Sequence, residues 1–303
     1  MNDIKLISYS ENGEIKAGVM KENMVHDLGL ELCQMDDWQH NETISLDTVF
    51  RNWPKFVPML DKITQAPTTT GLPINDVILH APLNNPGTIY CAGANYYDHA
   101  QEMGVSIDKG SIEPLFFLKS CGSIIGPNQN IELPRNYSEK YDWEVELAAV
   151  IGKKGHHLNT ENATDIIAGY TIFNDVSARD VGRRNDWNFG MDWFRHKSFD
   201  TSAPMGPWIV PSNQINNPQN LNLKTKINDK VMQDGNTNGM IFSIAELIVS
   251  LSRQVCLKPG DVIATGTCAG VGIFRGIFLQ PGDLIELEIE DIGILSNPVI
   301  QGN

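Results

Sequence analysis

The sequence predicts a predominantly β fold of the α+β class, with a small N-terminal unit (residues 1–80) followed by a larger strand-rich domain (residues 81–303). Short segments with alternating or continuous apolar residues recur along the chain, whereas few segments have a helical period. Most connections between them are too short to hold a helix, which favours mixed or antiparallel sheets over a doubly wound parallel sheet. Residues 66–73 are rich in proline and threonine, as is typical of a linker, and place the boundary near residue 80.

The N-terminal unit contains strand signals first and a helix signal later. Its predicted strands are three short apolar segments separated by turn-forming residues: 4–9, 15–20 and 24–28. In residues 47–63 the apolar side chains recur at helical spacing, and Asp47 is the expected N-cap. Pro54 and Pro58 lie inside the same region, so one continuous helix is not expected.

The larger domain contains the clearest β patterns. Residues 221–227 and 285–290 alternate apolar and polar side chains, so each is predicted to be a strand with one buried face. One clear helix is predicted at Ile244–Gln254, because Ser243 and Glu246 have the spacing of a capping box.

The composition excludes several classes of function. Hydrophobic residues make up 41% of the chain, and the formal net charge is -14, so the surface repels phosphate backbones and nucleic acid is not an expected partner. No apolar run approaches the ~20 residues that a membrane-spanning helix needs, and residues 1–10 lack the apolar core of a signal peptide. The five cysteines include no CxxC pair, which favours a reducing, cytoplasmic setting over a disulfide framework or a zinc site.

Two carboxylates lie on a segment that is predicted to be a buried strand. Glu144 and Glu146 are two residues apart before a long apolar run, so their side chains point to the same side. Two ionised carboxylates side by side in a buried place repel each other, and a divalent cation removes this conflict because hard cations bind oxygen ligands. The alternative is a solvated face, since Lys140 and Asp142 flank the strand with polar groups.

A third carboxylate, Asp175, ends the next apolar segment, residues 166–174. Functional sites are commonly built where strands end, although Asp175 could equally be the cap of a following helix. Three carboxylates that leave other ligand positions to water or substrate are typical of Mg²⁺ or Mn²⁺, with Ca²⁺ as a further candidate, and not of Zn²⁺.

An acid–base pair is predicted on a short helix that Asn95 should cap and Gly104 should end. His99 and Glu102 are three residues apart on it and are therefore neighbours on one face. A carboxylate beside a histidine fixes the tautomer and raises the basicity of the ring, so His99 is a candidate general base near neutral pH. The alternative is a surface pair, which this spacing more commonly indicates.

Several short motifs follow one another between about residue 83 and residue 300: GANYYDH (93–99), DWEVEL (142–147), NDVSARD (174–180), KSFDT (197–201), PMGP (204–207), MIFS (240–243) and TGTCAGVG (265–272). Together, and in this order, they resemble the fumarylacetoacetate hydrolase superfamily. The resemblance implies that the catalytic domain is a β-roll of mixed sheets, usually assembled as a homodimer, and that the N-terminal unit is a variable appendage.

The resemblance also implies roles for the residues that the patterns single out. The implied metal ligands are Glu144, Glu146 and Asp175. The implied catalytic dyad is His99 and Glu102, on a segment that often orders over bound substrate. Both assignments agree with the reasoning from the strands and the helix.

Four further residues complete the candidate site. The resemblance implies that Lys197 contacts a substrate oxygen, that Thr267 contacts the substrate carboxylate, and that Arg179 holds the metal-binding carboxylates or the substrate. Lys119 closes an apolar run. It could face the site and bind substrate, or it could extend from a sheet edge to solvent.

The sequence departs from the family pattern close to these residues. Gly182 stands where many relatives have glutamine, and His196 stands where they tend to have glycine. Residues 183–195, between these positions, combine aromatic and cationic side chains. This segment could line the site and set its specificity, or it could be a dimer or surface loop.

The reaction expected from this set is cleavage of a C–C bond in an acylpyruvate-type 2-oxo acid, of the fumarylpyruvate class, by a metal-dependent hydrolase. The metal ion would stabilise an enolate, and the intact dyad would activate water. The same site would allow decarboxylation of oxaloacetate or tautomerisation of a 2-hydroxymuconate-type diacid. A noncatalytic binding protein and a structural protein are the alternatives from other classes.

Overall fold

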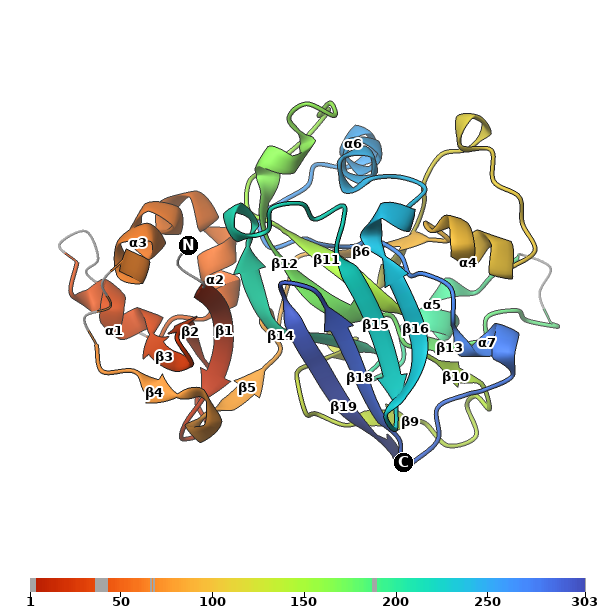
Figure 1. Ribbon diagram of the computed structural model, residues 1–303, viewed down its shortest axis with the longest axis horizontal. Helices are drawn as coiled ribbons and strands as arrows, with labels where there is room; N and C mark the ends of the chain where they lie inside the picture. The colour runs from red at the N-terminus through yellow and green to blue at the C-terminus, as the bar shows by residue number, and fades with distance from the viewer. Residues whose placement is uncertain (1–3, 36–42, 66, 68, 187–189, 303) are drawn as a thin grey trace.

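The computed structural model describes residues 4–35, 43–65, 67, 69–186 and 190–302. The protein is predominantly β, as predicted (Figure 1). A twelve-stranded mixed sheet has the main order β4 (Leu72–Pro73), β3 (Met24–Asp27), β2 (Lys16–Lys21), β1 (Ile4–Ser10), β14 (Ala203–Pro211), β12 (Ile167–Asn174), β11 (Val145–Ile151), β17 (Val262–Ala264), β6 (Ile89–Gly93) and β7 (Leu115–Lys119). Strand β5 (Ile78–His80) pairs with β1, and β8 (Ile124–Ile125) pairs with β14.

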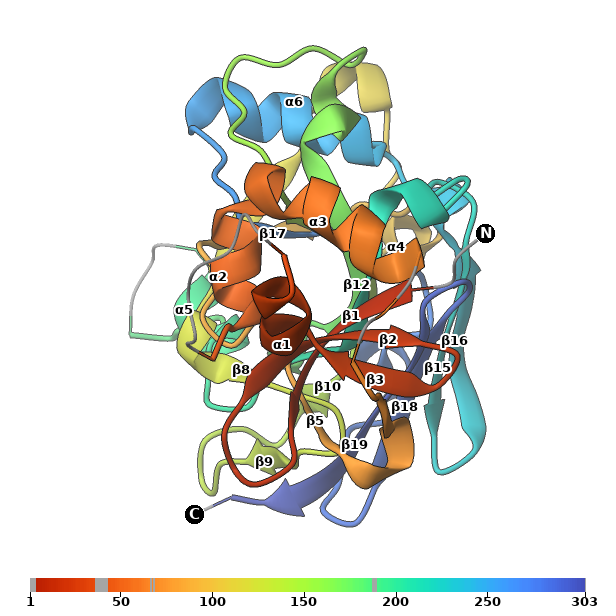
Figure 2. The ribbon, with the colours of Figure 1, turned by 90° about the vertical axis from the view of Figure 1, so that its left-hand side faces the viewer.

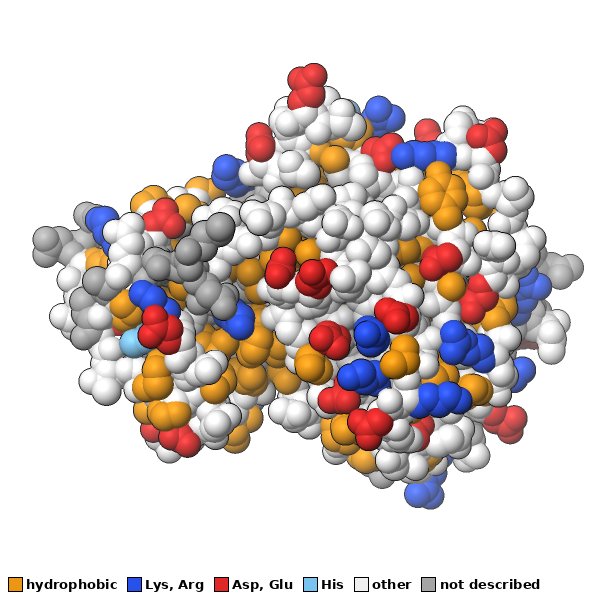
Figure 3. Space-filling model, in the orientation of Figure 1, with side chains coloured by type: hydrophobic (Ala, Val, Ile, Leu, Met, Phe, Trp, Pro, Cys, Tyr) orange, Lys and Arg blue, Asp and Glu red, His pale blue; other side chains and the backbone are white. Residues whose placement is uncertain are grey.

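A second sheet lies in front of the large one in Figure 1. Its strands are, in order, β16 (Lys230–Asn236), β15 (Asn222–Ile227), β18 (Leu284–Ile289), β19 (Gly293–Gln301) and β9 (Ile131–Leu133). Leu147, Leu223 and Leu287 belong to one buried core cluster that contains side chains of both sheets. The outer face carries interspersed acidic and basic side chains (Figure 3). The alternation predicted for β15 and β18 is therefore confirmed.

The helices are few and short, and none in the described part of the chain is long and apolar enough to cross a membrane. They are α1 (Leu28–Cys33), α2 (Leu46–Arg51), α3 (Trp53–Gln65), α4 (Tyr97–Glu102), α5 (Trp193–Lys197), α6 (Ile244–Gln254) and α7 (Gly272–Arg275). Single 3₁₀ turns are η1 (Ile74–Asp76), η2 (Lys109–Ser111), η3 (Cys121–Ser123), η4 (Ala163–Ile166), η5 (Ser212–Gln214) and η6 (Thr237–Gly239). Helix α6 has its predicted bounds, and Ser243 and Glu246 form the predicted capping box.

The helix predicted to start at Asp47 is interrupted and forms α2 and α3, with Pro58 inside α3. The prediction of Asp47 as its N-cap is wrong, because the Ser45 side chain accepts the hydrogen bond from the first turn of α2. Asp47 instead accepts hydrogen bonds from the backbone N–H groups of residues 84–85. Because Ser45 already caps α2, the Asp47 carboxylate is available to accept hydrogen bonds from a distant loop.

The N-terminal strands (β1, β2 and β3 in Figure 2) and the larger domain are parts of one sheet, because β1 pairs with β14, with Leu6 opposite Ile209. Leu6, Phe50 and Val150 belong to one buried cluster, so the N-terminal elements and the central strands share a core. Strand β4 lies within the predicted linker, of which residues 66 and 68 are outside the described part. The boundary near residue 80 stays a prediction.

Strands β11 and β12 are the structural basis of the candidate site. Both are entirely buried, since other strands flank them and both faces of the sheet are covered. They pair antiparallel with Val145 opposite Asn174, so β11 begins where β12 ends. The short sheet of β10 (Tyr141–Asp142) and β13 (Ser177–Ala178) continues this pairing beyond the same end. The residues just before β11 and just after β12 are therefore adjacent.

Candidate metal centre and catalytic site

Three carboxylates meet at the junction of β11 and β12. The Asp175 N–H donates to the Glu144 carbonyl oxygen at 3.0 Å, which fixes the two segments side by side. One carboxylate oxygen from each of Glu144, Glu146 and Asp175 lies within 4.8 Å of the others, and all three residues are buried. The alternative of a solvated face is therefore wrong. The alternative of a helix cap at Asp175 is also wrong, because β13 and not a helix follows it.

Lys197 joins two of these carboxylates. Its Nζ donates to Glu144 Oε2 at 2.8 Å and to Asp175 Oδ2 at 2.6 Å. Lys197 comes from α5, and its side chain lies over the ring of Phe117 on β7, with Nζ 5.2 Å from the ring centroid. Burial opposes the charged form, but the negative charges of Asp175 and Glu144 outweigh it and raise the pKa of Lys197. The lysine therefore holds a fixed positive charge beside the carboxylates.

Lys119 contacts the other carboxylate oxygen of Asp175. Its Nζ donates to Asp175 Oδ1 at 2.7 Å, to the carbonyl oxygen of Val176 at 3.0 Å, and to the carbonyl oxygen of Lys197. Its side chain is 0% exposed, so the alternative of an edge lysine reaching solvent is wrong. Contact with substrate does not fit this geometry either, because the three protons of the ammonium group already have acceptors inside the protein.

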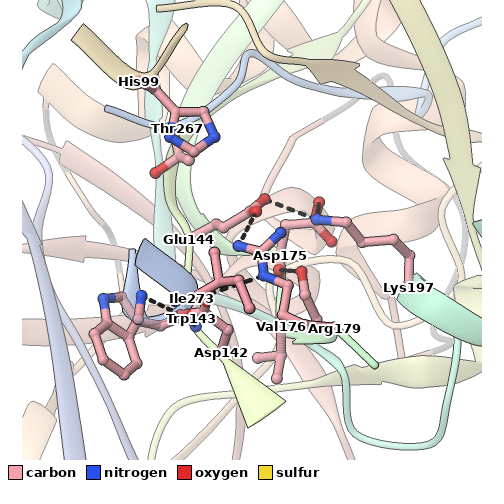
Figure 4. Close-up of polar contacts among 12 residues, drawn as sticks. His99, Asp142, Trp143, Glu144, Asp175, Val176, Arg179, Lys197, Thr267 and Ile273 are labelled. Atoms are coloured by element: carbon pink, nitrogen blue, oxygen red, sulfur yellow. Dashed lines mark hydrogen bonds and ion pairs between the residues drawn. The ribbon is translucent and has the colours of Figure 1, made fainter. Parts of the chain in front are cut away.

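Arg179 is an internal partner of the carboxylates as well. Its Nη2 donates to Glu144 Oε1 at 2.6 Å, and its Nε donates to Asp142 Oδ2 at 2.8 Å (Figure 4). Of the two roles that the resemblance implied, the geometry fits the one toward the carboxylates. Asp142 is 0% exposed and also accepts hydrogen bonds from the N–H groups of Gly272 and Ile273.

Asp142 is a site residue that the sequence reasoning missed. It was expected to be a polar flank of the strand, whereas it is fully buried. Its spacing was a usable signal, because Asp142, Glu144 and Glu146 follow one another at every second residue. Side chains at that spacing share one face of a strand.

The charges of this cluster do not balance. Asp142, Glu144 and Asp175 have cationic partners at ion-pair distance, whereas Glu146 has none among the described residues and accepts one hydrogen bond, from Gly266 N at 2.8 Å. Burial, together with the charges of Asp175 and Glu144, raises the pKa of Glu146 well above its ordinary value. Burial also opposes ionisation of Glu144, but the charges of Lys197 and Arg179 outweigh it and lower the pKa of that carboxyl. When all four carboxyl groups are ionised, the cluster has one negative charge in excess of its three cations, and the raised pKa of Glu146 reflects the cost of that charge.

This donor set fits a hard divalent cation. Each of Glu144, Glu146 and Asp175 offers an oxygen atom, and no histidine or cysteine belongs to the group found among the described residues. Oxygen-only sets of this kind suit Mg²⁺, Mn²⁺ or Ca²⁺ better than Zn²⁺. A divalent cation would also neutralise the uncompensated charge of Glu146.

The His99–Glu102 pair lies on α4. His99 Nδ1 and Glu102 Oε2 are 3.2 Å apart, and Glu102 also accepts a hydrogen bond from Gly270 N at 3.1 Å. His99 is only 7% exposed, so the alternative of a surface pair is wrong. Because a carboxylate only accepts hydrogen bonds, Nδ1 carries a proton, so in the neutral ring the lone pair lies on Nε2.

The start of α4 differs from the prediction. Its N-cap is Tyr96, which makes no capping hydrogen bond through its side chain, so the prediction of Asn95 as the cap is wrong. The Asn95 amide instead donates to the carbonyl oxygens of Phe242 and Thr265 at 3.0 and 2.8 Å. Asn95 therefore ties the dyad segment to two distant loops. Gly104, with φ of 74°, ends the helical turn as expected.

Thr267 lies in the loop after β17, between Gly266, which donates to Glu146, and Gly270, which donates to Glu102. In Figure 4 the Glu144 side chain lies between His99 and Thr267 on one side and Arg179 on the other. The Thr267 hydroxyl accepts a hydrogen bond from Gln233 Nε2 at 2.8 Å, so it keeps its own proton for another acceptor. The contact between Thr267 and a substrate carboxylate stays a prediction.

The side chains of residues 183–195 lie in different environments, and positions 187–189 are outside the described part. Trp193 stacks on Phe117 with ring centroids 4.8 Å apart, so one end of the segment supports the Lys197 side. Phe194, by contrast, is 69% exposed. His196, which follows the segment, is buried, and its Nδ1 lies 2.9 Å from the Ala178 carbonyl oxygen.

Similarity to known proteins agrees with this geometry. Residues 88–300 match the family described as fumarylacetoacetate (FAA) hydrolase C-terminal. A mitochondrial oxaloacetate tautomerase of Homo sapiens is 43% identical over 231 residues, which are 76% of this chain and 71% of the relative.

Two solved structures are similar over nearly the whole chain. Fumarylacetoacetate hydrolase from Exiguobacterium antarcticum is 33% identical with a TM-score of 0.81, covering 99% of this chain and 100% of that chain. Maleylpyruvate hydrolase from Sphingobium sp. SYK-6, in complex with manganese (II) ion and pyruvate, is 27% identical with a TM-score of 0.79 and the same coverage. The predicted fold class is confirmed. The chain belongs to the fumarylacetoacetate hydrolase family, whose members are enzymes.

Proposed function

We propose that this enzyme is a divalent-metal-dependent keto–enol tautomerase of oxaloacetate or a closely similar 2-oxo diacid. The observation that carries the proposal is the buried carboxylate triad with its uncompensated Glu146, close to the His99–Glu102 dyad. Sequence identity of 43% over 231 residues to a protein named oxaloacetate tautomerase supports this choice of reaction. Hydrolysis, which the sequence alone favoured, becomes the second candidate.

Glu144, Glu146 and Asp175 would hold the metal ion. Mg²⁺ and Mn²⁺ are the proposed ions, and the manganese in the similar maleylpyruvate hydrolase supports the latter. When bound, such an ion acts as a Lewis acid that favours the enolate form of a 2-oxo acid. Lys197 and Lys119 each donate to a different oxygen of Asp175, and Arg179 donates to Glu144, so two of the three ligand carboxylates are oriented before the ion binds.

His99 is the proposed general base. Its free Nε2 would take the proton from C3 of the diacid, and the electron pair of the C–H bond would form the C2–C3 double bond of the enolate. Return of that proton to the enolate oxygen gives the enol, so no atom is gained or lost. Glu102 keeps the ring in the required tautomer and stabilises the imidazolium that forms after proton transfer.

The second candidate is hydrolysis of an acylpyruvate. Similarity to a maleylpyruvate hydrolase over 99% of this chain favours it. In that reaction His99 would take a proton from water, the hydroxide would add to the distal carbonyl, and the C–C bond would break toward a pyruvate enolate. Decarboxylation of oxaloacetate would instead release CO₂ and the same enolate.

One substrate panel separates these reactions. Purified protein with Mn²⁺ or Mg²⁺ is supplied with enol oxaloacetate, acylpyruvates and a 2-hydroxymuconate-type diacid, and enol absorbance, pyruvate and CO₂ are followed. With oxaloacetate, we expect the enol absorbance to fall without release of an equal amount of pyruvate and CO₂. His99→Ala protein should not accelerate this loss of enol absorbance. Pyruvate release from an acylpyruvate as the fastest reaction would select the hydrolase instead.

We also propose that the protein is a homodimer and that it is located in the cytoplasm. Leu115 and Leu118 on β7 are 51% and 56% exposed, and Phe194 on the neighbouring α5 is 69% exposed. β7 pairs only with β6 among the described strands, so its other edge is free. Exposed apolar side chains at a free sheet edge are typical of an interface between chains. Light scattering after gel filtration would measure the mass.

A further inference from the structure

Helix α7 lies directly against the catalytic dyad. The ring of Phe274 on α7 makes an edge contact with His99, with centroids 6.0 Å apart. Gly270, just before α7, donates its N–H to Glu102. Figure 1 shows α4 and α7 at the same end of the molecule. A group carried by α7 is therefore close to the place where the dyad would act.

Arg275 ends α7, and no acidic side chain of the described residues pairs with it. It is exposed, and none of the ion pairs formed by the described residues includes it. Its guanidinium folds back over the dyad loop, because a Cβ atom at Gly270 would come within 3.0 Å of Arg275 Nη2. The positive charge thus lies beside the backbone that holds Glu102.

The other cations of the site are already engaged. Lys119 and Lys197 donate to Asp175, and Arg179 donates to Glu144 and Asp142. A 2-oxo diacid has two carboxylates, and only the one next to the keto group would approach the metal ligands. A cation beside the second carboxylate would offset the part of its hydration that this charge loses on binding.

We infer that Arg275 forms an anion subsite that binds the far carboxylate of a diacid substrate; this inference rests on the proposed function. The guanidinium fork suits a carboxylate, to which it can donate two hydrogen bonds. Its helix is anchored to the metal side, since Gly272 and Ile273 donate to Asp142, the partner of Arg179. The subsite is therefore held at a fixed distance from the metal-binding carboxylates, which would select for substrate length.

The test compares a diacid with a monoacid that has the same 2-oxo carboxylate. For Mn²⁺-loaded Arg275→Gln protein we expect KM for oxaloacetate to rise about tenfold, as for loss of a charge-assisted hydrogen bond, with kcat within about twofold. Inhibition by pyruvate, which lacks the far carboxylate, should not change. Arg275→Lys should recover part of the affinity, and Arg253→Gln, a change of an exposed arginine on α6, should match the wild type.

The inference would be overturned by an unchanged KM for oxaloacetate, or by equal weakening of oxaloacetate and pyruvate. Calorimetry of pyruvate and 2-oxoglutarate binding to the Mn²⁺-loaded protein tests the Arg275 subsite independently of the proposed function. If wild-type protein turns over no 2-oxo acid, the proposed function fails. In that case, tighter binding of the diacid by wild-type protein, lost in Arg275→Gln protein, would still support the subsite. If wild-type protein does not prefer the diacid, the subsite is refuted.

Discussion

The two halves of the site are held in place in different ways. The carboxylate cluster at the ends of β11 and β12 is buried, and each of its charges except that of Glu146 contacts an opposite charge. The dyad lies on a helix of six residues, and its carboxylate depends on one loop N–H group, from Gly270. Tyr97 and Met103 beside it are 48% and 44% exposed. Substitutions in the cluster should therefore alter stability and metal affinity, whereas substitutions in the dyad should alter the rate.

Glu146→Gln should separate metal binding from folding most strongly. We expect activity to fall by more than about a thousandfold, because the loss of a ligand charge removes the electrostatic stabilisation of the enolate. The melting temperature of metal-free protein should stay equal or rise, because a buried carboxylate without a cationic partner is removed. Calorimetry in the presence of a chelator measures this, and a clear loss of stability would contradict the assignment of Glu146 as the uncompensated charge.

His99→Ala should affect catalysis and leave the cluster intact. We expect kcat to fall by about a hundredfold or more, which is the usual contribution of a general base. The affinity for Mn²⁺ should not change, because His99 is not in the carboxylate group. Added imidazole should restore part of the rate. Reduced Mn²⁺ affinity in this variant would mean that the two halves are not independent.

Lys119→Met should destabilise the fold. It leaves Asp175 Oδ1 without its buried partner, and breaking a buried ion pair in this way costs about 3 kcal/mol. Urea unfolding of metal-free protein measures the loss, with Lys140→Met, a change of an exposed lysine, as the matched control. Added Mn²⁺ should recover part of the difference. If the two variants are equally stable, the role assigned to Lys119 is wrong.

The stability of metal-free protein should also depend on His196. Burial, with the charges of Lys197 and Arg179, lowers the pKa of His196 to about 3 from 6.5. The unfolded chain then binds a proton that the folded protein does not, so the free energy of unfolding falls as the pH decreases below 6.5. One such group changes the free energy of unfolding by at most about 1.4 kcal/mol per pH unit. Between pH 6.5 and about pH 5, the free energy of unfolding should fall less steeply in His196→Gln protein than in the wild type. Equal slopes in the two proteins would contradict this.

Local patterns in the sequence were sufficient to predict strand β11 and the shared direction of Glu144 and Glu146. A continuous apolar run predicts a buried strand such as β11, and alternation places Glu144 and Glu146 on one side. The position of Asp175 followed from the end of the next apolar run. That Asp175 joins the two glutamates was implied by the family resemblance, because the local pattern also allowed a helix cap at Asp175.

The partners of the buried polar groups could not be predicted in the same way. Asp142 accepts a hydrogen bond from Gly272, which is 130 residues away in the sequence. Lys119 is 56 residues from Asp175, and Asn95 is 170 residues from Thr265. A local pattern could not show that Lys119 is buried rather than exposed, because its partners come from segments that only the folded sheet brings together.

The direct test of the account of this site is a Mn²⁺ titration of the purified, metal-free wild-type protein, followed by electron paramagnetic resonance of the free ion. We expect one tightly bound ion per chain, and affinity weaker by about a hundredfold or more in Glu146→Gln protein. A wild-type chain that binds no Mn²⁺ or Mg²⁺, or a Glu146→Gln chain that binds Mn²⁺ as tightly as the wild type, would contradict the metal centre.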